Sequence, residues 1–150
     1  MKGATVSTKI PAPGAEVFAL LHDYERRLEW DTLLCEARLT GGFKAAEKGA
    51  TSVCVGRDFF GKVAMETRYV SFEPGRLAAV ELVGKPWFFE KFAASIRHDD
   101  VDGGSMITYK FRFAAKPRWL AWAMEPMMLG YLKHETAKRL EALASVWGRV

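Results

Sequence analysis

The chain has 150 residues, of which 49% are hydrophobic and 27% charged, as is typical of a soluble globular protein with a substantial core. The net charge of +4 comes from basic residues mixed with acidic ones, so we expect no specific nucleic-acid partner. Because no apolar run could span a bilayer and the first residues lack the apolar segment of a signal peptide, a cytoplasmic location with reduced thiols is expected.

The first part of the chain predicts a strand and two short helices. Residues 4–10 alternate in polarity like a strand, and the sequence PAPG then breaks it. Residues 15–23 form an amphipathic helix, and residues 24–30 form a second short helix. The second helix carries Trp30 among many charges, so we expect the indole to turn inward at one end of the core while its charged neighbours face water. Trp30 is then either a core plug or part of a ligand-contacting wall.

The middle of the chain predicts an antiparallel sheet. Its hydrophobic pattern has period two, and turn sequences such as DFFG, EPG and DDVDGGS interrupt it. The expected strands cover residues 33–40, 51–57, 62–72, 76–83, 87–98 and 106–113.

Glu90 is the most informative polar residue of these strands. It shares its parity with Phe88 and Phe92, which points it inward. An isolated buried carboxylate is costly, so an inward Glu90 needs a partner or stays protonated, as a general acid would. The alternative is that Glu90 reaches water near the start of its strand, because parity fails at β-bulges.

The C-terminal part predicts a long helix. Pro117 suits a first helical turn, and Pro126 is expected to kink or restart the helix, which then runs over residues 127–147 for about 30 Å. An aromatic and Met-rich segment, residues 119–131, lies at the helix entrance. It can pack against the last strand and the turn at residues 59–60, form a gate over a cavity, or contact a membrane.

Metal and cofactor sites are not expected from the sequence. The histidines, His22, His98 and His134, have no metal-type spacing, and neither do Cys35 and Cys54. No Gly-rich phosphate loop follows a strand.

This order of elements resembles the helix-grip fold of the START / Bet v 1-like superfamily, also called SRPBCC or polyketide cyclase/dehydrase. The resemblance is carried by IPAPGAEVFALLHDYERRLEWDTLL near the start, by the hairpin VSFEPGRLAAVEL, and by GGSMITYKFRF with the terminal helix. It covers nearly the whole chain and implies one α+β domain over residues 1–150. In that fold a curved antiparallel sheet of about seven strands wraps around the long C-terminal helix, with two short helices after the first strand.

The resemblance implies a cavity between sheet and helix that binds a hydrophobic small molecule: a lipid, an isoprenoid, or a polycyclic aromatic or polyketide. One alternative is a polyketide cyclase/aromatase-like enzyme in which Tyr69, Glu90 and Tyr109 act as acid, base or enolate stabiliser. A further alternative is an interaction module of the chaperone-activator or ribosome-associated type. Transient membrane contact and a monomer or homodimer are compatible with each. The residues expected to line the cavity are Trp30, Cys35, Met65, Thr67, Tyr69, Glu90, Phe92, Tyr109, Phe111, Met128 and Leu132.

Overall fold

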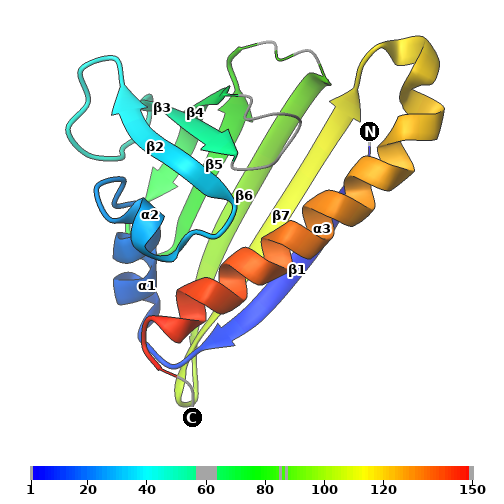
Figure 1. Cartoon of the computed structure of the whole chain (residues 1–150). Coiled ribbons are helices and arrows are strands. Elements are labelled where there is room, and N and C mark those ends of the chain that lie inside the picture. Colours follow the sequence, from blue (N-terminus) through cyan, green and yellow to red (C-terminus); the bar gives the residue numbers. More distant parts are fainter. Residues whose placement is uncertain (1, 57–63, 85, 87, 149–150) are drawn as a thin grey trace.

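The computed structural model describes residues 2–56, 64–84, 86 and 88–148 (Figure 1). Seven strands form one antiparallel sheet in the order β1-β7-β6-β5-β4-β3-β2. The strands are β1 (Lys2–Ile10), β2 (Leu34–Thr40), β3 (Thr51–Gly56), β4 (Ala64–Glu73), β5 (Leu77–Leu82), β6 (Phe89–Val101) and β7 (Gly104–Ala115). The helices are α1 (Gly14–Leu21), α2 (Arg27–Trp30), the 3₁₀ turn η1 (Arg118–Leu120) and α3 (Ala121–Ser145).

The two edge strands of the sheet, β1 and β2, are consecutive in the sequence. The helices α1 and α2 connect them, and α2 contacts both β2 and α3. The long helix α3 crosses one face of the curved sheet and packs on β1 and β7 (Figure 1). This is the predicted α+β helix-grip arrangement, with α2 joining the sheet edge to the long helix.

The helix α3 begins earlier than predicted. It starts at Ala121, five residues before Pro126, and continues through the proline as one element of 25 residues. A proline near the start of a helix removes only one backbone hydrogen bond, so the remaining turns can continue beyond it. None of the helices in the described residues is long and apolar enough to cross a membrane.

A polar contact from the sheet defines the start of α1. The backbone N–H of Gly14 donates to Asp100 Oδ1 at 2.7 Å, which caps the N-terminus of α1 from strand β6. The hairpin between β6 and β7 turns through Asp102 and Gly103, and Gly103 adopts a φ of 82° that favours glycine.

Two β-bulges change which side chains face inward. The register shifts between Leu34 and Glu36 in β2, so Cys35 leaves the alternation that parity predicts. It shifts again between Phe89 and Lys91 in β6, where Phe89 becomes fully buried and Glu90 becomes exposed. Of the two positions that the sequence leaves open for Glu90, the inward one is wrong and the solvent-exposed one is confirmed, because an extra residue reverses the parity on one side of a bulge.

Trp30 belongs to the core at the end where α1, α2 and the C-terminal turns of α3 meet. Its side chain is 6% exposed and packs in a cluster with Ile10, Val17, Leu140 and Leu143. The predicted burial of Trp30 is confirmed. The prediction for its charged neighbours holds only in part, because Glu25, Arg26 and Glu29 are exposed, whereas Arg27 and Asp31 are buried.

Candidate ligand cavity

An internal cavity of about 130 Å³ lies between the sheet and α3. Strands β3 to β7 supply one wall, and α3 supplies Leu132, Thr136 and Arg139. Seven of the residues predicted from the sequence line it: Met65, Thr67, Tyr69, Phe92, Tyr109, Phe111 and Leu132.

The other four predicted lining residues lie elsewhere. Trp30 and Met128 are buried in core clusters. Cys35 is half-buried at the bulge of β2, where its Sγ lies 4.0 Å from the Gly56 carbonyl oxygen, and Glu90 is exposed. Periodicity assigns these side chains to a face, but bulges and helix rotation decide which of them reach the cavity.

A chain of hydrogen bonds forms the polar wall of the cavity. His22 Nδ1 lies 2.7 Å from Tyr69 Oη, which lies 2.8 Å from Tyr24 Oη. Tyr24 donates to Ser52 Oγ at 3.2 Å, and Ser52 Oγ lies 3.1 Å from Thr67 Oγ1. Since Tyr24 has one hydroxyl proton and gives it to Ser52, Tyr69 donates to Tyr24 and His22 Nδ1–H donates to Tyr69. The other nitrogen, His22 Nε2, is then an acceptor, and it has no partner among the described residues.

Burial decides the protonation states of His22 and Tyr69 in this series of hydrogen bonds. Burial, followed by the positive charge of Arg27, holds the pKa of His22 well below its usual 6.5. Burial and then the neighbouring Tyr24 hold the pKa of the Tyr69 hydroxyl well above its usual 10.0. At neutral pH, His22 is therefore an uncharged imidazole and Tyr69 a protonated phenol.

A buried ionic cluster adjoins the polar wall. Asp31 accepts from Arg27 Nε at 2.9 Å and from Arg139 Nη2 at 2.9 Å. Burial alone would raise the pKa of Asp31, but the guanidinium groups of Arg139 and Arg27 lower it to about 2. Arg27 also lies 5.2 Å from the ring centre of Trp30, so the charged cluster and the indole pack together. This contact explains why a tryptophan occurs within so charged a segment.

Sequence reasoning missed the polar residues that α1, α2 and α3 bring to the cavity. The sequence pattern places His22 and Tyr24 at helix ends and the charged neighbours of Trp30, including Arg27 and Asp31, in solvent, and it gives no role to Arg139. A signal was present in the spacing, because Arg27 and Asp31 are four residues apart and so meet on one face of a helical turn. Arg139 carried no such signal, since it lies 108 residues from Asp31.

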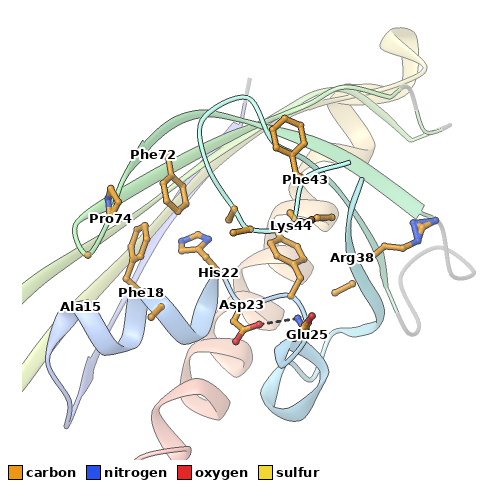
Figure 2. A pocket seen from close by; sticks show the side chains of 17 residues that line it. Ala15, Phe18, His22, Asp23, Glu25, Arg38, Phe43, Lys44, Phe72 and Pro74 are labelled. Atoms are coloured by element: carbon orange, nitrogen blue, oxygen red, sulfur yellow. Dashed lines mark hydrogen bonds between the residues drawn. The ribbon is translucent and has the colours of Figure 1, made fainter. Parts of the chain in front are cut away.

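An outer groove of about 970 Å³ has His22 and Tyr24 in its lining, and Figure 2 shows His22 among the side chains that line it. It runs between α1, β2, the loop after β2 and the turn after β4. Phe18 and Phe72 flank His22 in this groove. His22 and Tyr24 line both spaces, so they separate the solvent-open groove from the internal cavity.

The aromatic and Met-rich segment 119–131 divides into exposed and buried members. Trp119, Trp122 and Met127 are 75%, 78% and 77% exposed, whereas Met128 is buried at 4%. Packing against the last strand is therefore the wrong interpretation for those three exposed side chains. The turn at residues 59–60, which the sequence predicts as a second packing partner of this segment, lies outside the described residues.

The described residues contain no group of three or more His, Cys, Asp or Glu side chains that could hold a metal ion.

A family model described as polyketide cyclase / dehydrase and lipid transport matches residues 1–148. The chain belongs to this family. A comparison with curated proteins gives no match.

Solved structures share the fold at low sequence identity. A protein from Thermus thermophilus has a TM-score of 0.79 at 12% identity, covering 96% of this chain and 95% of that one. The di-domain ARO/CYC StfQ from the steffimycin biosynthetic pathway has a TM-score of 0.79 at 8% identity, covering 95% of this chain and 49% of StfQ. Ara h 8.0201 has a TM-score of 0.69 at 14% identity, covering 97% of this chain and 96% of that one. These likenesses show the Bet v 1-like fold.

Proposed function

We propose that this protein binds a hydrophobic small molecule in the cavity between the sheet and α3. The observation that carries the proposal is the two-sided cavity, with Phe92, Phe111 and Leu132 on its apolar side and the His22–Tyr69–Tyr24 chain on its polar side. Ligand pockets generally combine apolar walls with a few placed polar groups. Membership of a family described by polyketide cyclisation and lipid transport supports the same function.

The size of the cavity restricts the ligand. A volume of about 130 Å³ resembles that of an engineered apolar cavity, about 150 Å³, that takes up benzene. One ring or a short chain fits it directly. Lipids, isoprenoids or polycyclic aromatics fit only if α3 and the sheet move apart, or if part of the ligand stays in the outer groove.

Filling the cavity provides the test. An apolar fluorescent probe of one aromatic ring should bind the native protein saturably at a single site. Leu132→Trp places an indole in the cavity and should weaken binding by about tenfold or more, because the indole and the probe compete for the same space.

Lys133→Trp is the matched control, since Lys133 is the exposed neighbour on the same helix. It should leave probe binding unchanged. Binding that survives Leu132→Trp, or that occurs only in partly unfolded protein, would contradict a cavity site and favour the interaction module.

The second candidate is a cyclase-like enzyme. Converging polar groups favour it over a plain carrier, because Tyr24 and Tyr69 could donate to a ligand carbonyl or enolate if they gave up their hydrogen bonds to Ser52 and to each other. Glu90, proposed from the sequence as its acid, is exposed and does not line the cavity. His22 is a weak base when its pKa lies well below 6.5. Binding is therefore the better-supported function. Product formation from a poly-β-ketone thioester that is lost in Tyr69→Phe would reverse this preference.

We also propose that ligands enter from the outer groove, past His22 and Tyr24. Among the described residues, these two alone line both spaces, so a change in their rotamers could connect the groove with the cavity.

Three general properties belong to the same proposal. The protein acts as one domain over residues 1–150, supported by a single sheet that includes both β1 and β7. It works in the cytoplasm, in keeping with two free cysteines. It touches anionic membranes transiently through the exposed side chains of Trp119, Trp122 and Met127.

The charges around these three side chains support the membrane contact. Residues 110–133 carry one acidic residue, Glu125, and five basic residues: Lys110, Arg112, Lys116, Arg118 and Lys133. Glu125 is buried and accepts from the Ala115 N–H, so the exposed charge of this stretch is positive.

A further inference from the structure

The ionic cluster at the cavity contains two positively charged side chains and only one negatively charged side chain. Arg27 and Arg139 bring two guanidinium groups to the single carboxylate of Asp31. The side chains of Arg27, Arg139 and Asp31 are 8%, 13% and 0% exposed, respectively. None of the described residues that line the cavity is an aspartate or glutamate, and burial keeps His22 neutral. The cluster therefore holds a net charge of +1.

The excess charge cannot be removed by deprotonation, because arginine stays protonated in proteins. Burying an uncompensated charge is costly, and a nearby anion reduces that cost. A ligand that supplies the missing negative charge would therefore gain more binding free energy here than at an exposed arginine.

The hydrogen bonds of the cluster leave donors for such a ligand. Arg27 uses Nε toward Asp31 and Nη1 toward the Leu21 carbonyl oxygen at 3.0 Å. Arg139 uses Nε and Nη2 toward Asp31. Within the described part of the chain, Arg27 Nη2 and Arg139 Nη1 make no hydrogen bond, and both arginines line the cavity. Asp31 also accepts from the Leu33 N–H at 3.0 Å, so its oxygens are already well occupied.

The other side of the same cavity is apolar. Phe92, Phe111 and Leu132 face it, with Met65, Val80 and Phe89 beside them. A ligand that uses both sides has a charged end and an apolar body, and the volume of about 130 Å³ restricts the body to one ring or a short chain.

We propose that the cavity takes a small amphipathic carboxylate, with its anionic group at Arg27 and Arg139 and its apolar body against Phe92, Phe111 and Leu132. This inference rests on the proposed binding function and adds the charge and size of the ligand. An arginine pair suits a carboxylate because the planar guanidinium donates parallel hydrogen bonds to its two oxygens.

Benzoate and benzamide test the charge on the unmodified protein. The two probes have nearly the same shape, but only benzoate is anionic at neutral pH. We expect benzoate to bind about tenfold or more tightly than benzamide in calorimetry or NMR titration, as a charge-assisted hydrogen bond predicts. Equal binding of the two would overturn the anionic site and leave the cavity proposal intact. Failure of both, together with failure of the neutral ring probe, would instead overturn the binding function itself.

Arginine variants locate the site. Arg139→Gln should reduce the preference for benzoate over benzamide to less than about twofold, because the excess charge is gone. Lys138→Gln is the control, since it removes one positive charge from an exposed position on the same helix. Arg27→Gln and Arg26→Gln form a second matched pair on α2 and the residue before it, with Arg26 exposed.

An equal loss of preference in Lys138→Gln would show that overall charge, and not the cluster, attracts the anion, and would overturn the proposal. If Arg139→Gln fails to fold, the comparison of benzoate with benzamide and the Arg27 pair still decide it.

Discussion

At the scale of the residue, the contact between Trp30 and Arg27 accounts for a buried tryptophan within a charged segment. The indole fills the end of the core, and the guanidinium packs on its face at 5.2 Å while it pairs with Asp31. A charged segment can therefore enter the interior when its charges pair with each other and stack on an aromatic ring.

Trp30→Ala should lower the free energy of unfolding by roughly 3–5 kcal/mol, because it empties a well-packed site in the core. Urea denaturation measures the loss. Leu28→Ala is the control from the same turn, since Leu28 is 48% exposed, and it should change stability by less than about 1 kcal/mol. A similarly small effect of Trp30→Ala would show that the indole does not contribute to the core.

His98 should make the fold sensitive to acid. Burial lowers its pKa from 6.5 to about 4, and both ring nitrogens lack partners among the described residues. The unfolded chain therefore binds a proton more readily, so stability is full above pH 6.5 and falls as the pH drops toward 4. The loss from this residue reaches at most about 3 kcal/mol.

His98→Leu should flatten the fall in stability over this pH range, measured by urea denaturation at several pH values. His134→Gln changes an exposed histidine of α3 and should leave the pH dependence as it is. If the slope persists in His98→Leu, other groups, including the buried His22, account for the acid sensitivity.

At the scale of the element, the start of α3 combines two roles. Met128 packs into the core beneath it, while Trp119, Trp122 and Met127 project into solvent. Large exposed apolar side chains beside positive charges are typical of surfaces that contact anionic membranes.

The double substitution Trp119→Ser with Trp122→Ser should reduce binding to vesicles of phosphatidylcholine and phosphatidylserine by about tenfold, with little change in stability. Co-sedimentation measures the binding, which should also weaken in high salt as surface charge is screened. Leu28→Ser, at an exposed apolar position of α2, is the control. Equal binding to vesicles of phosphatidylcholine alone would contradict the electrostatic part of the proposal.

At the scale of the whole molecule, the outer groove and the internal cavity both have His22 and Tyr24 in their lining. If ligands pass between them, obstruction of the groove should alter rates and leave affinity unchanged, because a barrier on the path slows entry and exit alike.

Ala19→Trp, at an exposed position of α1 that lines the groove, should slow both association and dissociation of the ring probe by about tenfold in stopped-flow measurements. Glu16→Trp lies on the same helix outside the groove and should leave both rates unchanged. Unaltered rates in Ala19→Trp would place the entrance elsewhere.

The sequence by itself determined the order of the elements, the helix-grip fold and part of the cavity's wall. Alternating residues such as Met65, Thr67 and Tyr69 must share a face of their strand whatever the rest of the chain does, so local periodicity was sufficient. The tertiary structure alone decided the rest. Bulges turned Cys35 and Glu90 away, and the crossing of α3 brought Arg139 to Asp31 across 108 residues. Pairing of distant charges depends on how helices pack, and no local pattern records that packing. For this reason the charged end of the cavity could be recognised only in three dimensions.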